Sequence, residues 1–95
     1  MGKKFVQWVY DGVVYTIQLS DRPDKKLVAV YTKNGKTKKI YFGATGYEHF
    51  KDATGLLPKH LNHNDPERRR LFRARFRNQY NGEPNPLTLS WNLLW

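Results

Sequence analysis

The sequence contains no cysteine. This absence excludes disulfide bonds, thiolate metal sites and a cysteine nucleophile. Long hydrophobic runs are missing as well, because no stretch approaches the roughly 18 apolar residues of a membrane-spanning helix. The opening residues MGKKF lead into strand-like sequence without the apolar segment of a secretion signal. We therefore expect a protein that is not secreted and has no membrane partner.

Acidic residues are also scarce. Eight Asp and Glu stand against 17 Lys and Arg, which leaves a formal net charge of +9. Such a charge favours a polyanionic partner: nucleic acid, an acidic protein surface or anionic lipid. With 39% hydrophobic and 15% aromatic residues, the chain is too apolar to be disordered. We expect one domain spanning residues 1–95, with roughly 5,700 Å² of surface exposed when folded.

Two turn dipeptides divide the first half of the chain. Asp11-Gly12 separates the strand-like segments 5–10 and 13–19, and Asn34-Gly35 separates the segments 26–33 and 36–42. Both dipeptides tolerate the positive φ angles of a type I′ turn, so each predicts a β-hairpin. Alternation then assigns one face of the hairpins to the core: Val6, Trp8, Tyr10, Val13, Tyr15 and Ile17, with Leu27, Ala29, Tyr31, Ile40 and Phe42. The opposite face of the first hairpin is only half polar: Gln7, Thr16 and Gln18 alternate with Phe5, Val9 and Val14.

The second half of the chain predicts one helix. Residues 43–64 have no clean periodicity and are interpreted as a connection with a helical turn near residues 48–52. Asp65 is a predicted N-cap, followed by Pro66 at the first helical position and by helix formers up to Tyr80. The stripe Phe72, Phe76 and Tyr80 is expected to face the core. Residues 87–95 are too apolar for a loose tail, so we expect them to pack on the sheet or helix or to dock on another protein.

These elements predict the α+β class. The expected architecture is an antiparallel sheet of two β-hairpins, one Arg-rich helix packed on it, and an apolar C-terminal segment.

Several short motifs follow one another in the second half of the chain. They are Tyr41-Phe-Gly-Ala-Thr-Gly-Tyr47, then His60-Leu-Asn-His-Asn-Asp-Pro-Glu-Arg-Arg-Arg70, then Ala74-Arg75, and the closing Ser90-Trp-Asn-Leu-Leu-Trp95. In this order they resemble a family of small basic uncharacterised proteins encoded by nucleocytoplasmic large DNA viruses, with FGA-GY, HxD-ER and LLW motifs. The resemblance spans about residues 40–95. It implies a viral setting, in the virion or in the host cell interior, and it implies no particular chemistry.

Two groups of basic residues are candidate phosphate contacts. Arg70, Arg73 and Arg77 share one face of the predicted helix, and Arg69 lies at the border of that face. Glu67 is the only acid of the helix, so a partner that relieves the repulsion among its arginines is expected. The second group surrounds the tip of the second hairpin: Lys33, Lys36, Lys38 and Lys39. Each group has an alternative interpretation. The arginines would then be a solvated helix face, and the lysines would be a charged strand edge that prevents aggregation.

Catalysis is not expected. His49, His60 and His63, with Asp65, are the only candidate metal ligands or general bases, and Asp65 is better used as a helix cap. The sequence also lacks a nucleophile motif and a phosphate-binding loop. We therefore expect no catalytic residues, no metal and no cofactor.

The expected function is that of a non-catalytic, virion-associated protein that binds nucleic acid, DNA rather than RNA, mainly through backbone phosphates. The alternative is a minor capsid or cement protein that binds other virion proteins, with its Trp-rich end as an interface anchor.

Overall fold

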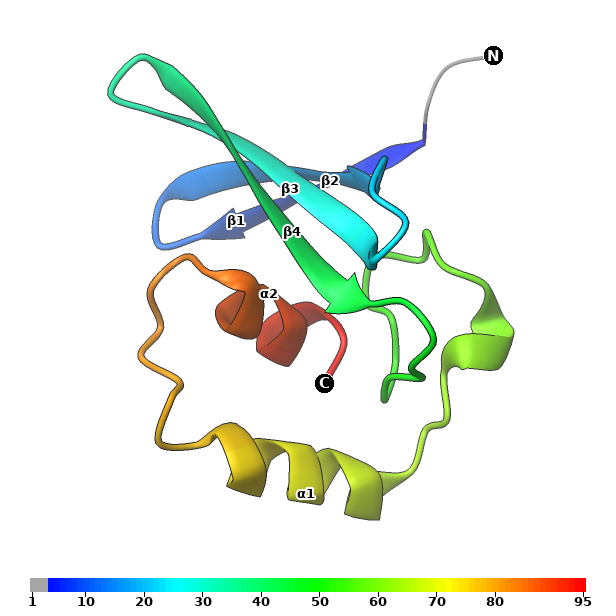
Figure 1. The fold of residues 1–95 in the computed structure, drawn as a ribbon. Coiled ribbons are helices and arrows are strands. Elements are labelled where there is room, and N and C mark those ends of the chain that lie inside the picture. The colour runs from blue at the N-terminus through cyan, green and yellow to red at the C-terminus, as the bar shows by residue number, and fades with distance from the viewer. Residues whose placement is uncertain (1–3) are drawn as a thin grey trace.

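The computed structural model describes residues 4–95 and confirms the α+β class. Four strands form an antiparallel sheet in the order β1-β2-β3-β4: Phe5–Tyr10, Val13–Leu19, Lys25–Lys33 and Lys36–Ala44. A 3₁₀ turn, η1, follows at Lys59–Leu61, and two helices complete the chain, α1 at Pro66–Phe76 and α2 at Pro86–Leu93. Both helices lie on the same side of the sheet (Figure 1).

Two glycine-containing turns set the register of the sheet. Asp11 and Gly12 have φ angles of 52° and 76°, and Asn34 and Gly35 have 53° and 76°. These left-handed conformations are what a two-residue hairpin turn requires. Tyr10 pairs with Val13, and Lys33 pairs with Lys36, directly across the two turns.

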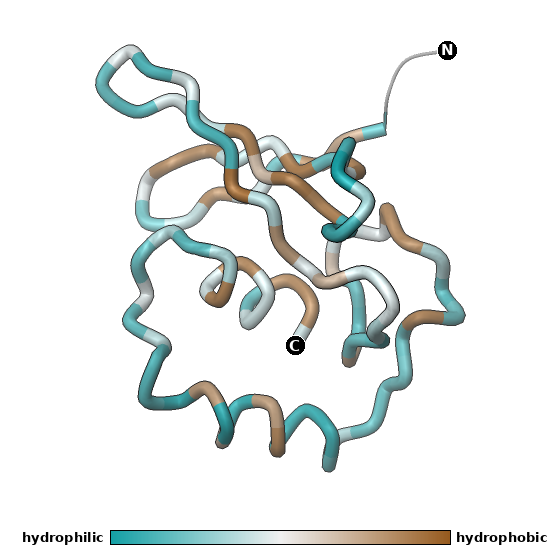
Figure 2. The backbone as a smooth tube through the Cα atoms, viewed as in Figure 1, coloured by the Kyte–Doolittle hydropathy of each residue, from teal (hydrophilic) through white to brown (hydrophobic). Residues whose placement is uncertain are grey.

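The core lies between the sheet and α2. Alternate strand residues are buried on the inner face and meet three leucines of the C-terminal segment: Tyr15, Ile17, Leu27, Ala29 and Phe42 from the sheet, with Leu89, Leu93 and Leu94. In Figure 2 these strand centres are brown, and most of the chain from residue 58 to residue 85 is teal. Gly43 permits close packing at the edge, because a Cβ atom there would lie 3.1 Å from Leu94 Cδ1.

The helices differ from the expectation in two respects. The segment that contacts the sheet is α2, whereas the Arg-rich helix α1 lies on the far side of α2 (Figure 1). No residue of α1 is fully buried, and Phe72 instead stacks on the Trp95 ring with a centroid distance of 4.4 Å. The expected packing of α1 on the sheet is therefore wrong, because the more apolar α2 occupies that face.

The boundaries of the irregular segments also differ. The helical turn expected near residues 48–52 is absent, and η1 stands later in the chain. Helix α1 ends at Phe76 rather than at Tyr80. Beyond it, the Tyr80 ring packs against Trp91 in a tilted arrangement with a centroid distance of 4.4 Å, and Asn92 Nδ2 donates a hydrogen bond to the Tyr80 hydroxyl. The chain leaves the helix where these contacts with α2 begin.

Candidate nucleic-acid interface

The tip of the second hairpin extends beyond the rest of the sheet. Pairing between β2 and β3 ends at Thr16 and Val30, whereas β3 and β4 stay paired as far as Lys33 and Lys36. Residues 31–38 therefore form a two-stranded ribbon that projects from the body of the molecule (Figure 1). We call residues 31–39, with their four lysines, the lysine arm.

All four lysines of the arm are exposed: Lys33, Lys36, Lys38 and Lys39. Two ion pairs occur within residues 4–95, Arg68 with Glu48 and Arg70 with Glu67, and neither involves the arm. The register places Lys38 opposite Tyr31 and Lys36 opposite Lys33 on one face, while Lys39 lies on the other face with Val30. Like charges directly opposite each other destabilise a ribbon, so an anion that binds between them would relieve repulsion.

The arginines of α1 do not form one exposed surface. Arg70 Nε donates to Glu67 Oε2 at 3.0 Å, and this hydrogen bond lowers the pKa of the Glu67 carboxyl. Arg73 turns inward, where its guanidinium lies 5.3 Å from the centre of the Trp91 ring and donates to the main-chain oxygen of Trp95. Arg77 is exposed at the C-cap. The structure therefore separates the three arginines that the helical wheel grouped together.

Arg69 also faces inward. Its Nε atom donates to the main-chain oxygen of Trp95 at 2.7 Å, and its guanidinium lies 4.9 Å from the centre of the Phe50 ring. Burial lowers the pKa of the neighbouring Arg73, and the charge of Arg69 lowers it further. Arg69 and Arg73 thus hold the end of the chain against α1. No pattern in the sequence pointed to Trp95 as their acceptor.

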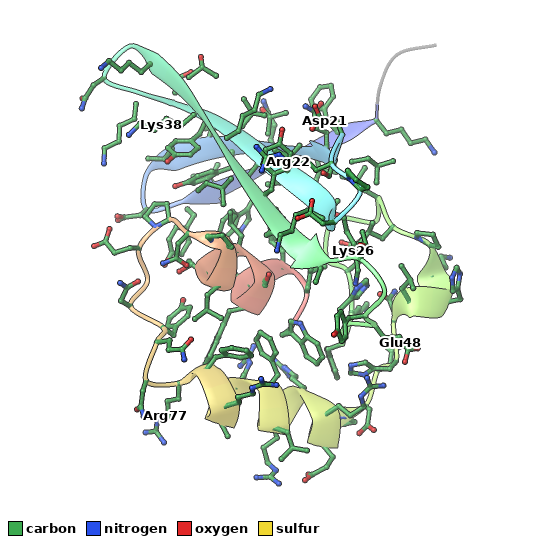
Figure 3. All side chains as sticks on the ribbon, in the orientation of Figure 1. Asp21, Arg22, Lys26, Lys38, Glu48 and Arg77 are labelled. Atoms are coloured by element: carbon green, nitrogen blue, oxygen red, sulfur yellow. The ribbon has the colours of Figure 1, made fainter. Side chains whose placement is uncertain are left out.

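The lysine arm and the exposed Arg77 of the helix lie far apart. In Figure 3, Lys38 lies on the projecting arm and Arg77 lies at the end of α1, on opposite sides of the molecule. The lysine arm is the denser group, with three lysines on the projecting ribbon and Lys39 at its base, none of them in an ion pair within residues 4–95.

The histidines do not converge. His49 is buried, and its ring nitrogens contact Asn62 Oδ1 at 2.6 Å and Lys26 Nζ at 3.2 Å. His63 Nδ1 accepts a hydrogen bond from the Asp65 amide, whereas His60 is exposed in η1. No group of three His, Asp or Glu side chains within residues 4–95 has the arrangement of a metal site.

Asp65 caps α1. Its carboxylate accepts hydrogen bonds from the amides of Glu67 and Arg68, at 3.0 and 3.4 Å. This is the structural role that its place before Pro66 predicts.

Comparison with known proteins finds no matching family model, no similar curated protein and no similar solved structure. Between residues 4 and 95, neither helix has the length and apolar character needed to cross a membrane.

Proposed function

We propose that this protein is a non-catalytic nucleic-acid-binding protein that holds backbone phosphates, with the lysine arm as its main contact. The observation that carries the proposal is the lysine arm, with three exposed lysines on the projecting ribbon, Lys39 at its base, and no ion pair to any of the four in the part of the chain that the structure describes. A virion of a large DNA virus is the proposed setting, and it rests on the motif resemblance.

The shape of the arm suits a duplex. The major groove of B-form DNA admits a two-stranded β-ribbon, and lysine ammonium groups bind phosphates as point charges. Because the cations are lysines on a flexible stem, the contacts are expected to follow the phosphates and to read little sequence.

Arg70 and Arg77 would add a weaker second contact. Arg70 already shares its charge with Glu67, and Arg73 and Arg69 are engaged with Trp95. The arm should therefore dominate the salt dependence of binding.

The test compares two variants on duplex DNA across a salt series. One replaces Lys33, Lys36, Lys38 and Lys39 with Gln, and the other replaces Arg70 and Arg77 with Gln. Each phosphate neutralised contributes about 0.9 to the slope of log affinity against log salt. We expect the lysine variant to flatten this slope by up to roughly 3 to 4 units, and the arginine variant by up to roughly 2. For each variant, the loss of affinity should be the same on duplexes of different sequence.

Two results would contradict the proposal. If the arginine variant removes the slope while the lysine variant keeps it, the helix is the contact and the arm is not. If the wild-type protein shows no measurable affinity for duplex or for single-stranded DNA at about 50 mM salt, nucleic-acid binding itself is wrong. The alternative of a minor capsid or cement protein, whose basic surface meets acidic virion proteins, would then replace it.

A further inference from the structure

The outer face of the sheet has no helix on it. Helix α2 lies against the inner face and α1 lies beyond α2 on the same side (Figure 1), and the residues of the core cluster point that way. Val28 is the exception: it belongs to the outer face and is nevertheless buried. The outer face is formed by the alternate residues of the four strands: Phe5, Gln7 and Val9; Val14, Thr16 and Gln18; Lys26, Val28, Val30 and Thr32; Thr37, Lys39 and Tyr41.

This outer face is unusually apolar for an uncovered surface. Phe5 is 56% exposed, Val9 is 65% exposed and Val14 is 49% exposed. Alternation places two charged strand residues on this face, Lys26 and Lys39, and the Lys26 ammonium group is engaged with the Tyr47 main-chain oxygen and His49 Nδ1. Apolar surface gathered in this way marks a contact site more often than isolated exposed side chains do.

An aromatic ring stands at each end of one row across this face. The register joins Phe5 to Gln18, Gln18 to Val28, and Val28 to Tyr41. Three interstrand spacings of about 4.8 Å make this row roughly 14 Å long. The side-chain amide of Gln18 lies in the middle of the row, between the two rings. A depression of ≈ 400 Å³ lies over Gln18 and Val28.

Positive charge surrounds the row. Lys4 and Lys39 line the depression, and the Arg22 guanidinium lies 4.1 Å above the centre of the Tyr41 ring. The Tyr41 hydroxyl donates to Asp21 Oδ1 at 2.8 Å, so this single acid is already engaged. Figure 3 shows Asp21 and Arg22 side by side at this edge of the sheet.

We propose that the outer face of the sheet binds single-stranded nucleic acid. Bases would stack on Phe5 and on the planar Arg22 and Tyr41 pair, while Lys4 and Lys39 would hold phosphates. A four-stranded sheet with surface aromatics is a platform of the size that stacks two or three bases. This inference rests on the proposed function. It adds that the bound nucleic acid is single-stranded, which the lysine arm alone does not determine.

Charge complementarity favours this occupant over a second copy of the chain. Two outer faces packed together would bring Lys4, Arg22 and Lys39 of both copies close to one another, against one Asp21 from each. A single strand neutralises these cations and also offers flat bases to the rings. A duplex keeps its bases stacked inside, so it can engage only the rim.

The experiment compares a short oligothymidylate with a duplex of equal length. The platform variant is Phe5→Ala with Arg22→Gln, and the matched control is Tyr47→Ala with Arg75→Gln. The control also removes an exposed aromatic ring and one arginine charge, both away from the sheet face. We expect the platform variant to lose on the order of tenfold or more in affinity for the oligothymidylate. Its affinity for the duplex should fall no further than that of the control.

Other outcomes separate this inference from the proposed function. If the wild-type protein binds duplex and not oligothymidylate, or if the platform variant loses no more than the control, the inference is wrong and the function of the arm stands. If the wild type binds neither, both are wrong. A wild-type dimer in sedimentation that Phe5→Ala converts to a monomer would overturn the inference in favour of self-association through this face.

Discussion

His49 is a buried residue whose pKa is lowered by the fold. Asn62 Oδ1 accepts hydrogen bonds from the Asp52 amide at 2.9 Å and from His49 Nε2 at 2.6 Å. His49 Nε2 is therefore the protonated nitrogen, and Nδ1 is left to accept from Lys26 Nζ at 3.2 Å. Burial, followed by the charge of Lys26, lowers the pKa of the imidazole from its ordinary value of 6.5. The neutral imidazole therefore links Lys26 of β3 to Asn62, which lies in the segment between the sheet and α1.

This lowered pKa predicts a loss of stability in acid. The unfolded chain takes up a proton on His49 at a higher pH than the folded chain does. The free energy of unfolding is therefore at its full value above pH 6.5 and falls as the pH drops below it. Burial lowers the pKa of His63 in the same direction. Each histidine should contribute a slope of up to about 1.4 kcal/mol per pH unit.

Urea unfolding between about pH 7 and pH 5 measures this slope. We expect His49→Gln to be less stable than the wild type near pH 7 and to lose less stability on acidification. His60→Gln, which removes an exposed imidazole, is the matched control. A His49→Gln variant with an unchanged slope would show that another group controls the acid response.

At the scale of the element, α2 stabilises the sheet. Asn85 caps it through a 2.8 Å hydrogen bond from the Thr88 amide, and Pro86 occupies its first turn. Leu89, Leu93 and Leu94 then fill the core over the inner face. Helix α1 contributes less, because it contacts the molecule mainly through half-buried aromatic rings.

Leucine-to-alanine substitutions should separate the two helices. Leu89→Ala removes a fully buried side chain, and we expect a loss of about 2 to 5 kcal/mol in the free energy of unfolding. Leu71→Ala, at an exposed position of α1, should change it by less than about 0.5 kcal/mol. Denaturant titration of both variants measures the difference. Equal losses would mean that the core does not lie between the sheet and α2.

These elements also show which parts of the structure are specified by the local sequence. The two hairpins were predictable because Asp11-Gly12 and Asn34-Gly35 fix their turns without help from distant residues. The start of α1 was predictable for the same reason, since Asp65 satisfies the first amides of its own helix. Asn85-Pro86 carries the same signal for α2, where Asn85 accepts a hydrogen bond from the Thr88 amide.

The whole molecule is flatter and more exposed than a compact chain of its length. Its surface of 6617 Å² exceeds the roughly 5,700 Å² expected for its mass. Its extents of 40 × 35 × 21 Å reflect the projecting arm and the sheet face without a helix. With a net charge of +9, this surface repels itself.

Salt should therefore stabilise the isolated protein. Raising the salt concentration screens repulsion among the lysines and arginines, and we expect a gain on the order of 1 kcal/mol, about 4 to 8 °C in Tm. Thermal melts from low to high sodium chloride measure the shift, and a polyanion such as polyphosphate should produce it at a much lower concentration. The variant with all four arm lysines replaced by Gln should show a smaller shift. A Tm that falls with salt would mean that attractive ion pairs dominate the surface.

The candidate site could be predicted only in part. The four arm lysines flank the Asn34-Gly35 turn, so the local sequence was enough to predict that they lie close together near one tip. The grouping of Arg70, Arg73 and Arg77 assumed that every residue on one helix face meets solvent. In the folded chain Arg73 reaches the Trp95 main-chain oxygen, 22 residues away in sequence. A helical wheel contains no information about such an acceptor.

By itself the sequence determined the charge, the turns, the alternation of the strands and the start of α1, because each depends on residues within a few positions of one another. The tertiary structure decided which helix covers the sheet, where α1 ends, which arginines stay free and which face of the sheet remains open. These depend on competition among apolar segments for one inner face, and α2 occupies it because its leucines bury more apolar surface than the Arg-rich α1 can.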